Sequence, residues 1–231
     1  MEDRTVILAA GDFPKKGGTA WKTLVAATRV VACDSAADAY CRRFRKWPDV
    51  IIGDLDSLCG QSTVPEASSP RGVGQPGCLP APRRETHRVR CSIPTSTDVI
   101  SIPDQDTNDL EKAMSYCAKR GWKANVIVGA TGKREDHTIG NVFRALDYGL
   151  TIVTDHGRFI PVCRKATFKV AKGVAVSVFA PDPKTRMTSK GLEWPLDAVK
   201  FRNLYCATLN RATGTRIVLT STHPVTVYVA S

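Results

Sequence analysis

Two short acidic segments contain the side chains best suited to chemistry. Both directly follow a short apolar run rich in β-branched residues, and together they contain five aspartates: Asp54, Asp56, Asp104, Asp106 and Asp109. Carboxylates at this density repel one another, and a bound hard cation relieves that repulsion. The pattern predicts a Mg²⁺ site for phosphate chemistry.

Each acidic segment also has a plainer interpretation. Asp54 and Asp56 are two residues apart, so at an extended strand end they share one face, and Gly53 lets a ligand approach the backbone closely. The alternative is a solvated turn. In the second segment, Asn108 or Thr107 could simply cap the next helix.

A third segment, Gly-Ala-Thr-Gly-Lys-Arg-Glu-Asp-His at 129–137, resembles a phosphate-binding loop. It is not a Walker A motif, because it lacks both the earlier glycine and the hydroxyl residue after the lysine. A strand, a glycine-rich turn and a helix start can still bind phosphate through backbone amides, with Lys133 and Arg134 adding positive charge. Alternatively this is a tight basic turn, in which Asp136 caps the helix and His137 packs.

Alternating strands and helices are expected to hold these segments as far as residue 155. The predicted strands are 4–10, 28–33, 49–53, 99–103, 124–129 and 150–154, and the predicted helices are 20–27, 35–46, 108–119 and 136–148. Apolar strands that each lead into a helix indicate a parallel sheet covered on both faces. Ligands of such sheets bind at the carboxyl ends of the strands. Asp34 follows the second strand, where it could meet a ribose or a phosphate-bound metal.

A different pattern begins near residue 157. Short β-branched runs at 166–170, 173–179, 199–201, 208–210, 216–220 and 226–229 predict a small antiparallel sandwich or barrel. We therefore expect an α/β domain at 1–156 and a β-sandwich domain at 157–231. Residues 58–97, rich in Pro, Ser, Gly and Arg, predict a flexible excursion from the first domain, with a nucleic-acid-binding arm as the alternative.

Composition narrows the class of protein. The 231 residues carry a formal net charge of +11. The basic residues are scattered along the chain, and only 7% of all residues are aromatic. Attraction of a polyphosphate substrate therefore explains the positive charge as well as nucleic-acid binding does. Eight cysteines occur without a C-x-x-C pair, which favours buried free thiols over zinc. No apolar run reaches the roughly 18 residues of a membrane span, and the acidic start is not a signal peptide. We expect a cytoplasmic protein.

Further motifs accompany the two acidic segments and the glycine-rich segment: Ala-Gly-Asp at 10–12, Cys-Asp-Ser-Ala at 33–36, Thr-Ser-Lys-Gly-Leu-Glu-Trp-Pro-Leu at 188–196, and Leu209-Asn210 with Gly214. Taken together, these motifs resemble the thiamine pyrophosphokinase family. The resemblance covers nearly the whole chain except 58–97. Lys133 is a departure, because the family often has glycine there.

The resemblance implies an α/β catalytic domain, a β-sandwich, a homodimer with shared active sites, and transfer of a diphosphate from ATP to the hydroxyl of thiamine, releasing AMP. The Mg²⁺ ligands and catalytic carboxylates would be Asp54, Asp56 and Asp109. ATP would contact Asp34, Asp104, Gln105, Asn108, Thr131, Arg134 and Asp136. Thiamine would contact Gln105 and Asn210. No membrane or nucleic-acid partner is expected; the alternatives are a pterin-type acceptor on the same fold, or a non-catalytic nucleotide or nucleic-acid binder.

Overall fold

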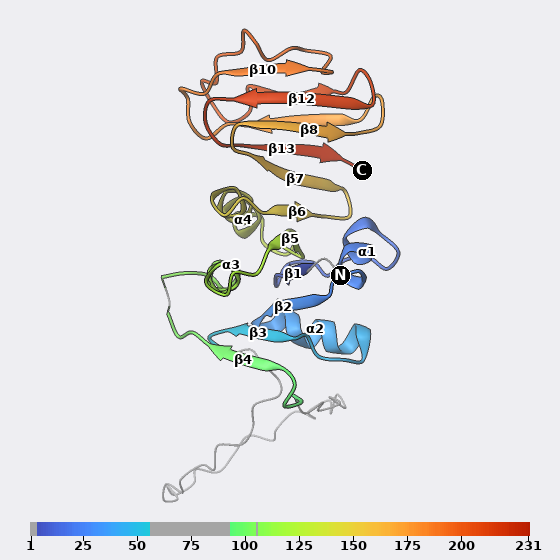
Figure 1. Ribbon diagram of the computed structural model, residues 1–231, viewed down its shortest axis with the longest axis vertical. Coiled ribbons are helices and arrows are strands. Elements are labelled where there is room, and N and C mark those ends of the chain that lie inside the picture. Colours follow the sequence, from blue (N-terminus) through green and yellow to red (C-terminus); the bar gives the residue numbers. More distant parts are fainter. Residues whose placement is uncertain (1–3, 56–92, 105) are drawn as a thin grey trace, which may run out of the picture.

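The computed structural model describes residues 4–55, 93–104 and 106–231. Most strands in the first part of the chain are followed by a helix, as Figure 1 shows. The strands are β1 (Thr5–Leu8), β2 (Arg29–Cys33), β3 (Val50–Gly53), β4 (Asp98–Ser101), β5 (Ala124–Val128) and β6 (Thr151–Val153). The helices are α1 (Thr19–Val25), α2 (Asp34–Phe44), α3 (Asp109–Lys119) and α4 (Glu135–Asp147).

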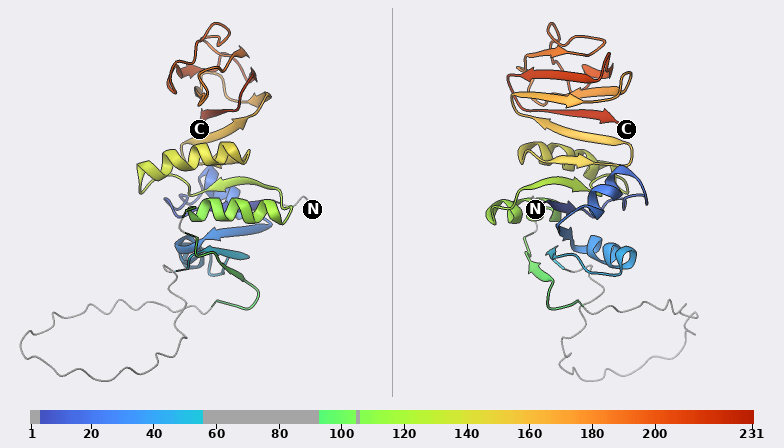
Figure 2. Two further views of the ribbon diagram at one scale, coloured as in Figure 1. Left: turned by 90° about the vertical axis from the view of Figure 1, so that its left-hand side faces the viewer. Right: turned by 45° about the vertical axis from the view of Figure 1, so that its right-hand side comes forward.

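These six strands form the parallel part of a larger sheet, in the order β4-β3-β2-β1-β5-β6. Side chains alternate between the two faces, as a pleated strand requires. Ile7 of β1 packs in the core beneath α3 and α4, and its neighbour Leu8 packs in the core beneath α1 and α2. Figure 2 shows α3 and α4 on the same side of the sheet. The predicted parallel sheet, covered on both faces, is confirmed.

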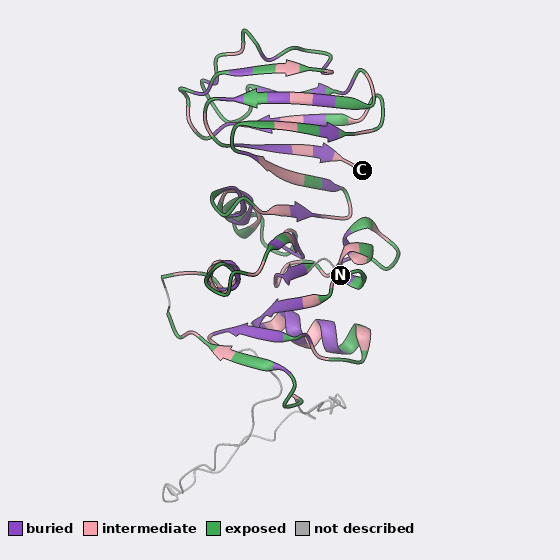
Figure 3. Ribbon diagram, in the orientation of Figure 1, coloured by how far each residue is buried: buried purple, intermediate pink, exposed green. Residues whose placement is uncertain are grey.

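The second part of the chain is entirely β. Its strands are β7 (Gly157–Val162), β8 (Lys165–Lys169), β9 (Ala175–Phe179), β10 (Met187–Lys190), β11 (Ala207–Arg211), β12 (Arg216–Ser221) and β13 (Val225–Ala230). The large sheet continues from β6 through β7, β13 and β9 to β11, and a second sheet has the order β10-β12-β8. Between them lies a core of buried side chains such as Phe201 and Leu219. Figure 3 shows the alternation of buried and exposed positions along these strands. This agrees with the predicted sandwich.

One predicted strand is wrong. Residues 199–201 form no strand: the Val199 N–H donates to the carbonyl of Leu196 in a turn. Phe201 then enters the core, only 1% exposed. The segment contains apolar residues because a loop residue is buried in the core, not because the segment pairs with a strand of a sheet. The prediction also missed β7 and β10. Strand β7 contains Pro161, and β10 is mostly polar because its outer face meets solvent.

Other predictions have mixed outcomes. Most of the 58–97 excursion lies outside the described residues, but its end packs on the sheet: Thr97 is buried, and its hydroxyl donates to the Pro48 carbonyl at 3.0 Å. All five described cysteines are thiols, although Cys163 and Cys206 are exposed rather than buried. Among the described helices, none is both long and apolar enough to cross a bilayer.

Candidate active site

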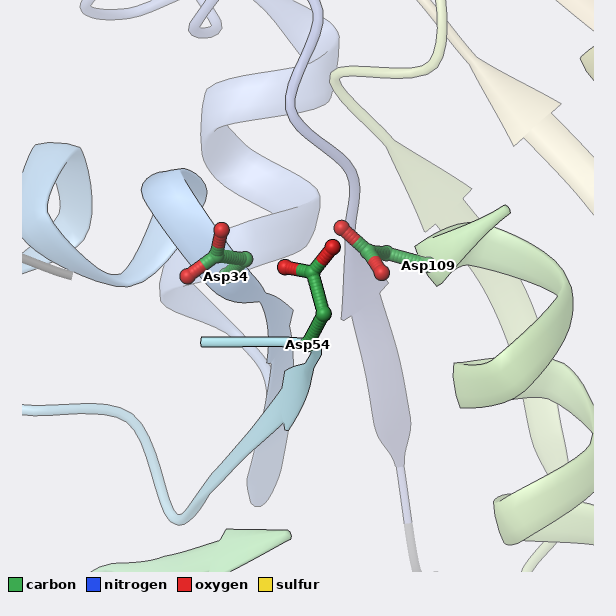
Figure 4. Close-up of side chains that lie close together, drawn as sticks. All are labelled: Asp34, Asp54 and Asp109. Atoms are coloured by element: carbon green, nitrogen blue, oxygen red, sulfur yellow. The ribbon is translucent and has the colours of Figure 1, made fainter. Parts of the chain in front are cut away.

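Three aspartates from separate elements meet at the carboxyl edge of the parallel strands. Asp34 follows β2 and begins α2, Asp54 follows β3, and Asp109 begins α3. Figure 4 shows their carboxylates gathered in one place. Two of the three lie in the first turn of an 11-residue helix, where the positive end of the helix dipole stabilises an anion.

The spacing of the carboxylates suits a shared cation. One oxygen from each aspartate can be chosen so that all three lie within 4.8 Å of one another, with Asp34 buried and the other two half-buried. We call Asp34, Asp54 and Asp109 the aspartate triad. The structure thus brings together two of the predicted metal ligands with Asp34, which was assigned to ATP. Asp56, the third predicted ligand, lies outside the described residues.

Gly53 makes room for the triad. A Cβ atom at this position would lie 2.9 Å from the Cβ of Asp34 and 3.2 Å from Oδ1 of Asp109. Real Cβ atoms essentially never show a contact as short as the first, and the second is tighter than most, so a residue with a Cβ would force Asp34 to shift. Glycine is required here by close approach to two side chains rather than by an unusual backbone angle.

Cys33 lies beside the triad but does not offer a thiolate. Burial raises the pKa of the Cys33 thiol well above its ordinary value, and the negative charge of Asp109 raises it further. The sulfur therefore stays protonated at neutral pH. Because thiolates are the form that binds metals and attacks electrophiles, the site offers oxygen ligands, which are the kind that Mg²⁺ prefers.

The glycine-rich segment lies next to the triad, at the point where the strand order reverses between β1 and β5. The Gly11 N–H donates to the Gly129 carbonyl at 2.7 Å, and the Asp12 N–H donates to the Thr131 carbonyl at 2.8 Å. Lys133 has a positive φ of 56° and donates from Nζ to the Ala10 carbonyl at 2.7 Å. These bonds hold the loops after β1 and β5 together at the switch point, where such sheets bind ligands.

Arg134 and Asp136 form an exposed bidentate ion pair at the start of α4. The guanidinium donates to both carboxylate oxygens, at 3.1 and 2.5 Å. This contact lowers the pKa of Asp136 to about 2 and raises that of Arg134. A cavity of about 280 Å³ extends from this helix start to Asp109, the one triad member among its lining residues, which also include Lys133, Arg134 and His137.

Two other predicted ATP contacts have identifiable structural roles. Asn108 caps α3 by accepting a hydrogen bond from the Glu111 N–H at 2.8 Å, which bears out the plainer interpretation of this residue. Asp104 accepts from the hydroxyl of Thr107 at 2.5 Å and from the Asp106 N–H at 2.9 Å, and these bonds lower its pKa. Contacts of Asn108 and Asp104 with ATP remain predictions, and Gln105 lies outside the described residues.

Asn210 lies far from the triad within one chain. Its side chain is buried: Nδ2 donates to the Trp194 carbonyl at 2.7 Å, and Oδ1 accepts from the N–H groups of Trp194 and Arg211. Strand β11, which contains Asn210, is at one edge of the large sheet, and seven strands separate it from β3. At about 4.8 Å per strand, the separation along the sheet is roughly 40 Å.

One residue beside the triad was missed by the sequence analysis. Lys112 is buried and its Nζ lies 3.3 Å from Oδ1 of Asp109. The apolar pattern gave little signal, because Lys112 is two positions after the core residue Leu110 and one before Ala113, and residues at those spacings do not share a helix face. The signal present was a lysine in the first turn of a helix, where the helix dipole opposes a positive charge.

A parallel sheet with a carboxylate triad and a glycine-rich loop at its switch point is typical of proteins that bind nucleotide phosphates. Comparison with known families is more specific. Residues 83–153 match the family model "Thiamin pyrophosphokinase, catalytic domain", and residues 157–228 match "Thiamin pyrophosphokinase, substrate-binding domain". Together the two matches span more than half of the chain. The chain belongs to the thiamin pyrophosphokinase family.

Individual relatives are distant. The curated protein Thiamin pyrophosphokinase 1 of Caenorhabditis elegans is 26% identical over 120 residues, which are 48% of this chain and 37% of the relative's length. The match therefore spans little more than a third of that relative. Asp109 lies within the catalytic-domain match, whereas Asp34 and Asp54 precede it.

Solved structures share the fold over almost the full length. Thiamine pyrophosphokinase from Bacillus subtilis has a TM-score of 0.64 at 15% identity and covers 99% of each chain. The enzyme from Geobacillus thermodenitrificans has a TM-score of 0.67 at 18% identity, covering 98% of this chain and 97% of the other. Thiamin pyrophosphokinase from Candida albicans has a TM-score of 0.64 at 12% identity, and the match covers 99% of this chain and 89% of the other. At these identities the likeness supports the fold alone.

Proposed function

We propose that this chain transfers a diphosphate group from ATP to the hydroxyl of thiamine, producing thiamine diphosphate and AMP, and that the reaction requires Mg²⁺. The observation that carries the proposal is the convergence of the aspartate triad beside the loops at the switch point. Membership of the family makes thiamine the acceptor to test first.

The triad suits Mg²⁺ by its donor type and its spacing. Two oxygens on opposite sides of a Mg²⁺ ion lie about 4.2 Å apart, close to the 4.8 Å within which the three aspartate oxygens fall. Asp34, Asp54 and Asp109 would hold the ion, with Asp56 as a further proposed ligand outside the described residues. When bound, Mg²⁺ neutralises negative charge on the phosphate oxygens of ATP.

The surrounding residues would position the nucleotide and the acceptor. Gly132, Lys133 and Arg134 of the glycine-rich loop line the cavity that Asp109 also lines. Backbone amides and basic side chains of such a loop would suit a polyphosphate. A carboxylate that meets the thiamine hydroxyl could accept its proton, and Asp109 or Asp56 is proposed for this role. Much of the catalysis would then consist of positioning and charge neutralisation.

A homodimer with shared active sites is part of the proposal. Asn210 cannot reach a substrate held at the triad of its own chain, since seven strands intervene. A second copy could bring its β11 edge to the triad. Large apolar side chains are exposed around this edge: Trp194, Leu204, Tyr205 and Leu209. An exposed tryptophan also offers a face on which a thiamine cation can stack.

The domain limits 1–156 and 157–231 and the cytoplasmic location remain proposals. The two family matches end and begin at 153 and 157, which fits a domain boundary there. The five described cysteines are thiols, a state that a reducing compartment maintains.

The decisive experiment incubates the purified protein with ATP, Mg²⁺ and thiamine and separates the products. We expect thiamine diphosphate and AMP in equal amounts, and no product when EDTA is added. Formation of ADP and thiamine monophosphate would rule out diphosphate transfer. A product formed only when a hydroxymethyl-pterin replaces thiamine would assign a different acceptor to the same fold.

A further inference from the structure

A lysine is enclosed beside the aspartate triad. The side chain of Lys112 is only 4% exposed, and its Nζ lies 3.3 Å from Oδ1 of Asp109, one turn earlier on α3. Burial of an ammonium group is strongly unfavourable unless an anion compensates it. The first turn of a helix opposes a positive charge as well, because the helix dipole is positive at that end. Two unfavourable effects are therefore accepted at one position, next to a proposed metal ligand.

The charge of Lys112 also acts on the loop before α3. Hydrogen bonds from Thr107 and from the Asp106 N–H are the main reasons for the lowered pKa of Asp104, and the positive charge of Lys112 contributes a smaller part. Lys112 thus lies within electrostatic reach of both the triad and the 104–108 loop that leads into α3. Lys112 as a whole is buried, so protein atoms enclose the aliphatic part of its side chain as well as its ammonium group.

We propose that Lys112 is a positioning residue for the triad: its ammonium orients the carboxylate of Asp109 and offsets part of the repulsion among the three aspartates before a divalent cation binds. This inference rests on the proposed function, because it takes the triad to be the Mg²⁺ site. When the cation arrives, it and the ammonium compete for the same carboxylate. Lys112 therefore weakens cation binding while it keeps Asp109 in a productive orientation.

The test compares three substitutions in the full-length protein. Lys112→Met removes the charge but keeps the length and the apolar contacts, Lys112→Arg keeps the charge, and Lys119→Met makes the same chemical change at an exposed position of the same helix. Thermal unfolding is followed in EDTA and across a Mg²⁺ titration at constant ionic strength. This readout needs neither ATP nor thiamine.

Loss of the charge should have opposite effects without and with Mg²⁺. In EDTA, we expect Lys112→Met to unfold about 3 °C or more below the wild type. Addition of Mg²⁺ should raise the unfolding temperature of Lys112→Met by more than it raises that of the wild type. The midpoint of this rise should occur at a Mg²⁺ concentration about tenfold lower than in the wild type, because a like charge no longer repels the ion. Lys112→Arg should behave like the wild type, and Lys119→Met should leave both measurements unchanged.

Turnover gives a second signature. At saturating Mg²⁺ we expect Lys112→Met to have a lower kcat together with a lower KM for Mg²⁺, a combination that a general loss of stability does not produce. An unchanged or weaker Mg²⁺ response in Lys112→Met would overturn the proposal. So would failure of both Lys112→Met and Lys112→Gln to fold in the presence of Mg²⁺, because the lysine would then be needed by the fold itself.

These outcomes separate the inference from the proposed function. If no thiamine diphosphate forms but the Mg²⁺ responses differ as expected, the role of Lys112 at a cation site stands and the reaction is wrong. If thiamine diphosphate forms and Lys112→Met responds to Mg²⁺ like the wild type, the reaction stands and the role of Lys112 is wrong.

Discussion

A Cβ atom on Gly53 would lie 2.9 Å from the Cβ of Asp34, so the two residues are packed more closely than a residue with a side chain would allow without a shift. Gly53 ends β3, and Asp34 begins α2 after the neighbouring strand β2. The contact joins two adjacent strands at the edge where their carboxylates meet. The proposed metal site therefore depends on a residue that has no side chain of its own.

The first prediction concerns this close contact. Gly53→Ala should lower kcat by about 10²-fold, because displacement of a reacting group by about 1 Å has an effect of that size. The Mg²⁺-induced rise in Tm should shrink as well. The matched control is Gly140→Ala in α4, where an added Cβ meets nothing within 4 Å. That variant should keep full activity and gain about 0.5–1 kcal/mol of stability. Full activity in Gly53→Ala would show that the triad tolerates rearrangement.

The second prediction concerns the charge of the triad. Asp54→Asn should lower kcat by about 10² to 10³-fold, as loss of one transition-state-stabilising group typically does, and should abolish stabilisation by Mg²⁺. The fold should survive, since asparagine has nearly the same shape. Asp98→Asn removes an equal charge from the exposed start of β4, whereas the triad lies where the strands end. This variant should change neither kcat nor the stabilisation by Mg²⁺. Normal Mg²⁺ stabilisation of Asp54→Asn would remove Asp54 from the metal site.

The third prediction concerns pH. Arg134 lowers the pKa of Asp136 from 3.8 to about 2. A carboxyl group with a lowered pKa contributes its stabilisation above the ordinary value, and this contribution is lost as the pH falls through about 2. Asp136 should therefore remain ionised from pH 4 upward and cause no pH dependence of activity between pH 5 and 8. Carboxyl NMR titration should show the pKa of Asp136 returning toward 3.8 in Arg134→Gln.

The fourth prediction concerns the backbone at Lys133, which has a φ of 56°. Lys133→Gly and Lys133→Ala both lose the hydrogen bond to the Ala10 carbonyl, so their difference reports the backbone alone. The glycine variant should be more stable by about 0.5–1 kcal/mol, because the left-handed region is unfavourable for a residue with a Cβ. Urea unfolding measures this difference. Equal stability would mean that the loop changes conformation when the lysine is removed.

The fifth prediction concerns Asn210, which holds the backbone of Trp194 through both of its polar atoms. Asn210→Ala should lower the free energy of unfolding by about 1–3 kcal/mol, since the freed backbone groups are partly buried. It should also raise the KM for thiamine if Trp194 contacts that substrate. Asn125→Ala, at an exposed position of β5, serves as the control for a simple amide deletion. Unchanged stability of Asn210→Ala would show that Trp194 keeps its position without Asn210.

Much of the fold could be predicted because the apolar pattern is local. Each apolar strand of the first part is followed by a polar segment, and the parallel arrangement places the ends of those strands at the same edge. Positions 199–201 could not be predicted correctly, because a buried loop and a short strand have the same apolar composition. The polar strand β10 was missed for the converse reason: one of its faces meets solvent, and little apolar pattern remains.

The sequence by itself determined which residue types the site offers: aspartates after β2 and β3 and at the start of α3, a glycine-rich turn, and no cysteine pair suited to zinc. The tertiary structure alone decided that Asp34 joins Asp54 and Asp109, that Lys112 lies beside Asp109, and that seven strands separate Asn210 from β3. The physical reason is that distances between elements depend on strand order and side-chain packing. These couple residues far apart in the chain and leave no mark on local composition.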